Sequence, residues 1–333
     1  MGISTNKNRN LSLDLVKVIA MIGVVALHCQ LYIPREYSST FYLSTLASGF
    51  PIPLFFIVSG YLMFSREPNV GYAVKKILKI LRFLIEFVGI FWLLACMPKG
   101  SNIIYWPKFV ALSMLQEGPL PVFWYFGAMC ILYALLPLLL YLDRRFPKFL
   151  IIFVASLFVI ENLVFVLNCM VGLDQKIHQS LRVWNWLFYF SLGGLLLKYK
   201  SSLSIVIVRF WYILILAMCY TIFYGVVKCH FPIMKNTDLC YGNVICTLYA
   251  LSLFLWCMQH PIKQSNIISQ LSPLFLPVYS LHLFVYEYYF DYVNLGILGD
   301  LSPIVDFSLV ALATICISWC IMKTPILNRI FRI

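Results

Sequence analysis

Charged residues are scarce in this sequence. Only 11% of its 333 residues are Asp, Glu, Lys or Arg, whereas 62% are hydrophobic. Soluble domains carry about 25% charged residues, so this composition excludes a soluble globular protein. The basic residues are also scattered over short segments instead of gathering on one surface, which argues against binding to nucleic acid.

Metal-site motifs are also lacking. No Cys-x-x-Cys pair and no His–Cys spacing predicts a metal centre, and most of the eleven cysteines fall inside apolar runs, where they are expected to pack. Cys229 and Cys240 leave two possibilities open, a disulfide on the outer side or two thiols. We therefore expect neither a metal nor a bound cofactor.

Long apolar runs, in contrast, recur along the whole chain. A helix of about 20 apolar residues spans a hydrocarbon core of about 30 Å, and runs this continuous are helices and not barrel strands. The sequence predicts an all-α integral membrane protein with about ten transmembrane helices in one bundle. The expected segments are 13–31, 46–64, 82–98, 121–142, 149–170, 184–199, 210–228, 241–259, 272–291 and 304–322.

The positions of Lys and Arg indicate the orientation of these segments. If the N-terminus is cytoplasmic, most of the 25 basic residues fall in cytoplasmic loops, as the positive-inside rule requires. Both termini are then cytoplasmic. The first apolar segment is too long for a cleavable signal peptide, and no soluble domain is evident, so residues 1–333 are expected to form a single transmembrane domain.

The first apolar segment carries three ionisable residues. Asp14, Lys17 and His28 lie in a run that is otherwise almost wholly apolar. Ionisable groups cost roughly 2.5–3.5 kcal/mol at the centre of a membrane and are usually retained for a use. Lys17 and His28 would lie on nearly the same helix face, roughly 16 Å apart along the axis. This polar face indicates a functional site.

Several motifs follow one another in order along the chain. Lys17 is followed by ten residues and then His28, and Phe55–Gly60 reads Phe-Phe-x-x-Ser-Gly. The later motifs are Lys76–Arg82, Pro121 to Pro137, Tyr189–Gly194, Leu271–His282 and Lys323–Pro325. Taken in this order, they resemble the membrane-bound acyltransferase 3 family, whose first helix carries a basic residue and a histidine and whose second helix carries the Phe-Phe-x-x-Ser-Gly signature. Lys17 stands where that family normally carries Arg.

This resemblance implies an O-acyltransferase of the plasma (inner) membrane. Such an enzyme moves an acyl group, commonly acetyl from cytoplasmic acetyl-CoA, onto a hydroxyl of a cell-surface glycan or a lipid-linked carbohydrate. Acyl-CoA is then the donor substrate, and the expected partners are this donor, the carbohydrate acceptor and membrane lipid. The implied role is O-acetylation of cell-envelope polysaccharide.

The donor and base residues follow from chemistry together with this resemblance. His28 is the candidate general base, because a neutral imidazole takes a hydroxyl proton near neutral pH. CoA carries several phosphates, and Lys76, Lys79 and Arg82 recur every three residues as a basic stripe at the inner end of the third expected segment. Asp14 and Lys17 are expected to join the donor site at the cytoplasmic end of the first segment.

Other side chains are candidates for the acceptor side. Trp124 is expected near an outer helix end, where stacking on a sugar ring and an aromatic belt at the interface are alternative roles. Tyr279 and His282 lie in the ninth expected segment, and Glu287 shares a helix face with Asp291. These carboxylates either orient a glycan hydroxyl or are simply solvated at a helix end.

Each of these candidate site residues can also have a purely structural role. His28 can be a buried histidine that is bonded to a neighbouring helix, Lys17 can pair with Asp14, and Arg82 can pair with Glu86. Ser59-Gly60 is best explained by close helix packing. A transporter, a flippase-like exporter of polysaccharide intermediates and a non-catalytic family member are the alternative functions, although the internal repeat typical of many transporters is not found.

Overall fold

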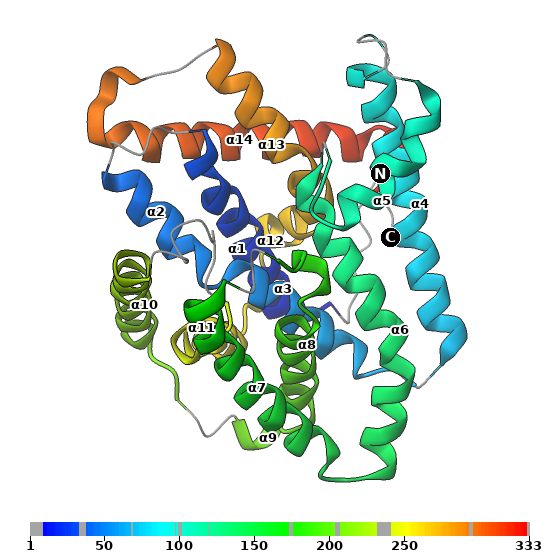
Figure 1. Ribbon diagram of the computed structural model, residues 1–333, viewed down its shortest axis with the longest axis vertical. Coiled ribbons are helices and arrows are strands. Elements are labelled where there is room, and N and C mark those ends of the chain that lie inside the picture. Colours follow the sequence, from blue (N-terminus) through cyan, green and yellow to red (C-terminus); the bar gives the residue numbers. More distant parts are fainter. Residues whose placement is uncertain are drawn as a thin grey trace. The chain divides into compact units, whose positions relative to one another are not determined.

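The computed structural model of the protein describes residues 9–32, 38–67, 69–96, 98, 102–118, 120–172, 176–203, 207–231, 241–292 and 296–331. All regular secondary structure in these ranges is helical, as the coiled ribbons of Figure 1 show. The all-α fold class is therefore confirmed.

Within the described ranges, seven helical stretches are long and apolar enough to cross a membrane. The other three expected segments also fall on helices: α4 (Val70–Phe91), which carries a row of basic residues, and α8 (Val183–Lys198) and α11 (Val244–Gln259), which have 16 residues each. A total of ten spans and the orientation of the termini remain predictions. The seven stretches are Leu11–His28, Ser38–Met63, Pro121–Arg145, Phe149–Val171, Phe210–His230, Asn266–Tyr292 and Gly299–Lys323.

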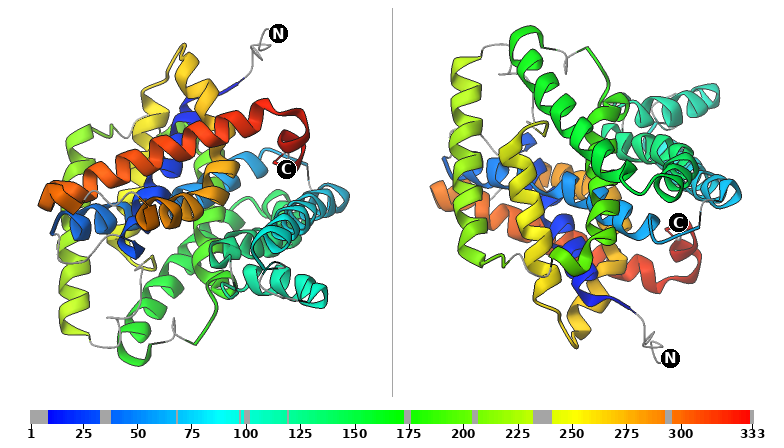
Figure 2. Two further views of the ribbon diagram at one scale, coloured as in Figure 1. Left: turned by 90° about the horizontal axis from the view of Figure 1, so that it is seen from above. Right: turned by 90° about the horizontal axis from the view of Figure 1, so that it is seen from below.

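The contacts of the chain divide it into two compact units, each built from separate stretches of sequence. Unit 1 consists of residues 1–58, 200–226 and 239–320. Within it, α1 contacts α2, α11, α12 and α13, and both views of Figure 2 show α1 (dark blue) among these helices. The helices wholly or largely in unit 1 are α1 (Leu11–His28), α2 (Ser38–Ser48), α3 (Pro51–Met63), α9 (Lys200–Leu203), α10 (Phe210–His230), α11, α12 (Asn266–Leu271), α13 (Phe275–Tyr292) and α14 (Ser302–Lys323).

Local sequence explains how α1 starts and how closely it packs. The side chain of Asn10 caps the helix by accepting from the backbone N–H groups of Ser12 and Leu13, at 3.0 and 3.3 Å. Further along, a Cβ at Gly23 would lie 2.6 Å from Cγ of Pro51. Glycine therefore allows α1 to approach the start of α3 more closely than any other residue would.

The second expected segment, 46–64, is interrupted in the structure. α2 ends at Ser48 and α3 begins at Pro51, so two helices replace the one that hydropathy indicated. Proline favours the first turn of a helix because it has no backbone N–H to leave unsatisfied there. Pro51 therefore marks a new helix start inside an apolar run.

Unit 2 consists of residues 59–199, 227–238 and 321–333, and it includes the end of α3. A Cβ at Gly60 would lie only 1.8 Å from the backbone oxygen of Phe190 on α8, and the hydroxyl of Ser59 bonds to that of Tyr125. The predicted packing role of Ser59-Gly60 is thus confirmed. The remaining helices of this unit are α4, α5 (Trp106–Met114), α6 (Trp124–Arg145), α7 (Phe149–Val171), α8 and α15 (Pro325–Ile330).

Two expectations are not decided by this architecture. The two units are compact by internal contacts, and a single domain over residues 1–333 stays a prediction. The proposed Cys229–Cys240 pair cannot be placed, since Cys240 lies outside the described residues.

Replacement of Gly60 by alanine should destabilise the fold. The added Cβ meets backbone, which cannot rotate away, so we expect a loss of about 1–3 kcal/mol. Thermal unfolding of the purified protein in detergent measures this loss. Gly225→Ala on α10 is the matched control, because nothing lies within 4 Å of its added Cβ. Equal midpoints for the two variants would contradict the packing role of Gly60.

Candidate active site

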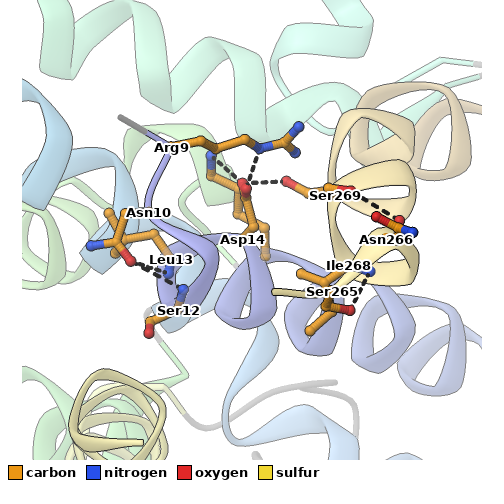
Figure 3. Close-up of polar contacts among 11 residues, drawn as sticks. Arg9, Asn10, Ser12, Leu13, Asp14, Ser265, Asn266, Ile268 and Ser269 are labelled. Atoms are coloured by element: carbon orange, nitrogen blue, oxygen red, sulfur yellow. Dashed lines mark hydrogen bonds and ion pairs between the residues drawn. The ribbon is translucent and has the colours of Figure 1, made fainter. Parts of the chain in front are cut away.

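A buried carboxylate organises the N-terminal end of α1. Asp14 is 5% exposed and forms an ion pair with Arg9, drawn in Figure 3. Nζ of Lys17 lies 3.6 Å from its Oδ1, and the hydroxyl of Ser272 donates to the same oxygen at 2.7 Å. A negative charge in the first helical turn is also favoured by the helix dipole. Asp14 thereby holds two cations at this end of the helix.

The last residue of α1 lies against a second histidine. Nδ1 of His28 is 3.1 Å from Nε2 of His282 on α13, and the two ring centroids are 4.8 Å apart at an angle of 53°. His282 is completely buried, whereas His28 is half-buried. The planes of the two imidazoles are therefore tilted against each other, without parallel stacking.

Backbone carbonyls determine where the ring protons lie. Nδ1 of His28 is 2.8 Å from the carbonyl oxygen of Val24, and Nδ1 of His282 is 2.8 Å from that of Tyr279. Because a carbonyl oxygen only accepts, each Nδ1 carries the hydrogen in the neutral imidazole. The lone pair of His28 then resides on Nε2, as a general base requires.

An aromatic group continues beyond the histidines. The ring of Tyr32 stacks on that of Tyr286 at 5.2 Å and lies 6.2 Å from that of Phe290. The hydroxyl of Tyr286 donates to the carbonyl oxygen of Val25 at 3.2 Å. Burial raises the pKa of Tyr32, and the charges of Glu287 and Asp291 raise it further. Aromatic rings and carboxylates thus lie close together among the residues that follow His28 and His282 along the chain.

The basic residues of α4 belong to unit 2. Asn69 caps this helix, so Lys75, Lys76, Lys79 and Arg82 lie on a continuous helix that starts earlier than the expected segment 82–98. Burial lowers the pKa of Lys76, and the nearby Lys79 and Arg66 lower it further. The positive charges of Lys79 and Arg66 thus act on Lys76, and a cluster of like charges of this kind favours a polyanion.

Arg82 has partners within the same unit. Its Nε lies 3.8 Å from Oε1 of Glu86, which confirms the pair expected from their spacing. Its Nη2 also donates to the backbone oxygen of Arg329 at 3.4 Å. Both Arg82 and Glu86 are partly exposed, so this pair adds little to stability.

The sequence matches the model of a known protein family. The family model described as an acyltransferase domain, acyltransferase 3, matches residues 10–323, nearly the whole sequence. The chain belongs to the acyltransferase 3 family. No curated protein and no solved structure matches. With its apolar helices, this family membership indicates a multi-pass membrane acyltransferase.

The acyltransferase 3 motifs predicted from sequence lie at distinct places in the structure. Within unit 1, Asp14 and Lys17 pair near one end of α1, and His28 lies at its other end against His282. Tyr279 is buried, and its contribution here is the backbone oxygen next to His282. Glu287 is exposed on α13. In unit 2, Trp124 is 7% exposed and packs 4.8 Å from Trp186.

Two contacts at this candidate site were not predicted from the sequence. Ser272 bonds to Asp14 across 258 positions, and His282 meets His28 across 254. All four residues are evident in the sequence, but no periodic pattern predicts the register between two helices so far apart along the chain. The order of the motifs was the available signal that these two segments belong to one site.

Neutralising the carboxylate should weaken the N-terminal end of α1. Asp14→Asn keeps an acceptor for Ser272 but loses the charge that holds Arg9 and Lys17. Because both cations are partly exposed, we expect a loss of about 1 kcal/mol. Thermal unfolding in detergent measures it, with the exposed Asp291→Asn as control. An unchanged midpoint for Asp14→Asn would exclude this anchoring role.

Proposed function

We propose that this acyltransferase 3 member is an O-acyltransferase. It transfers an acyl group, with acetyl as the first candidate, from cytoplasmic acyl-CoA to a hydroxyl of a cell-surface glycan or lipid-linked carbohydrate. The observation that carries the proposal is the contact of 2.8 Å between Nδ1 of His28 and the carbonyl oxygen of Val24. An Nδ1–H that donates to this oxygen leaves the lone pair of the neutral ring on Nε2, which can accept a proton. The residue ends an apolar helix long enough to cross a membrane.

The proposed reaction needs one base and one acid. Nε2 of His28 takes the proton from the acceptor hydroxyl while that oxygen attacks the thioester carbonyl carbon. The tetrahedral intermediate then collapses, the C–S bond breaks, and the CoA sulfur takes the proton from the imidazolium. The products are the O-acyl ester and free CoA thiol, and His28 returns to its neutral form. A relay through an acyl-His28 would give the same products in two steps.

Two groups of cations are candidates for binding the donor. The stripe of Lys76, Lys79 and Arg82 suits phosphates, because the positive charges near Lys76 repel it and a bound anion would relieve that repulsion. Lys17, supported by Asp14, is the second candidate. Asp14 is itself anionic and would repel a phosphate, so we assign it the role of holding Lys17 and Arg9 in place.

The acceptor is proposed to approach the histidines from the side of the aromatic group. Tyr32, Tyr286 and Phe290 follow His28 and His282 along their segments, and Glu287 and Asp291 are exposed nearby. Sugars are commonly bound by an aromatic ring together with carboxylates that accept from their hydroxyls. Glu287 is therefore retained as an acceptor-side residue, whereas Trp124 would need to leave its contact with Trp186 to stack on a sugar.

Loss of the proposed base should abolish acyl transfer. In membranes that contain His28→Ala, transfer from labelled acetyl-CoA should fall by about 10²–10⁴-fold at equal expression. His260→Ala is the matched control, because His260 makes the same Nδ1 contact, 2.9 Å to the carbonyl four residues earlier, but is exposed. Equal, measurable transfer by wild type and His28→Ala would exclude catalysis by this residue. Absence of transfer in both would favour an exporter or a non-catalytic member.

Charge at position 17 should affect donor binding more than turnover. Lys17→Ala should raise the KM for acetyl-CoA about tenfold, as expected when a charged hydrogen bond is lost. Lys17→Arg should preserve or lower that KM, since guanidinium binds phosphate in a bidentate manner. Steady-state kinetics with varied acetyl-CoA measures both. An unchanged KM in Lys17→Ala would remove Lys17 from the donor site.

A further inference from the structure

We propose that His282 is a positioning residue for His28, holding its ring and stabilising the imidazolium that forms during acyl transfer. The inference rests on the proposed function, in which His28 is the base. It assigns to His282 a neutral version of the role that a carboxylate plays in many catalytic triads.

The proton arrangement of His282 is fixed by its own helix. Its Nδ1 lies 2.8 Å from the carbonyl oxygen of Tyr279 and 3.2 Å from that of Val278. Both groups only accept, so Nδ1 donates, and the lone pair of the neutral ring is on Nε2. α13 thus presents an acceptor, and not an N–H, to the histidine of α1.

That acceptor faces the one nitrogen of His28 that carries a hydrogen. Nδ1 of His28 carries a single hydrogen, which two acceptors share in a three-centre hydrogen bond: the carbonyl oxygen of Val24 at 2.8 Å and Nε2 of His282 at 3.1 Å. The first lies on the same helix as His28 and the second on α13. Together they fix the ring of His28 relative to both helices, which a single carbonyl on the same helix does not do.

The same contact changes in strength during the reaction. When Nε2 of His28 takes the proton from the hydroxyl, its ring becomes a cation, and a charged donor forms a hydrogen bond about twice as strong as a neutral one. The bond from Nδ1 to His282 is therefore stronger in the charged intermediate than in the resting state, and this differential is what lowers a barrier. A neutral imidazole provides this without placing a second charge among buried groups.

Two variants separate this role from mere packing. His282→Gln keeps an oxygen that can accept from Nδ1 of His28, whereas His282→Leu fills the space without an acceptor. We expect His282→Leu to lower kcat about 100-fold, with the KM for acetyl-CoA little changed, and His282→Gln to recover at least a tenth of wild-type kcat. Equal kcat values for the two variants, or a change in KM alone, would overturn the proposal. His260→Leu serves as the control for loss of an exposed histidine.

A spectroscopic measurement tests the contact without relying on activity. The chain holds only five histidines, so 15N-histidine labelling of the protein in lipid gives few signals. We expect scalar coupling between Nδ1 of His28 and Nε2 of His282 across the hydrogen bond, and its loss in His282→Gln. Absence of this coupling in the wild type would overturn the proposal. If the coupling is present but the protein transfers no acyl group, the proposed function fails while the geometry stands.

Discussion

The pairing of α1 with the segment from Ser272 to Phe290 is the constraint on which the site depends. Contacts follow the same order along both segments: Asp14 bonds to Ser272, His28 meets His282, and Tyr32 stacks on Tyr286 and lies near Phe290. The two segments therefore run in the same direction. A shift of α13 by one turn would break all of these contacts together.

Polar side chains on this pair of segments bond to one another and to backbone oxygens. Asp14 takes its partners from both cations and a hydroxyl, and each histidine uses backbone oxygens that already belong to a helix. Burial makes such contacts costly to lose and hence orders them. A base held in this way needs little reorganisation when it takes a proton, which is the usual source of catalytic advantage in a preorganised site.

The apolar runs were enough to predict the helical class and the position of most helices, because a membrane span requires an apolar run of sufficient length. It did not predict the break before Pro51 or the start of α4 at Val70, which depend on a proline at a helix start and on the cap by Asn69. At the site, the spacing on α1 placed Asp14 next to Lys17 and His28 at the far end. The meeting of His28 and His282 depends on the register between two helices separated by most of the chain, and no local pattern encodes it.

The histidine pair and the basic stripe of α4 belong to different units of the chain. Under the proposed function, proton transfer and recognition of the anionic donor would therefore be encoded in separate stretches of sequence. The same acid–base pair could then be inherited unchanged while the cations of α4 change, which would give this architecture a simple route to new donor specificities.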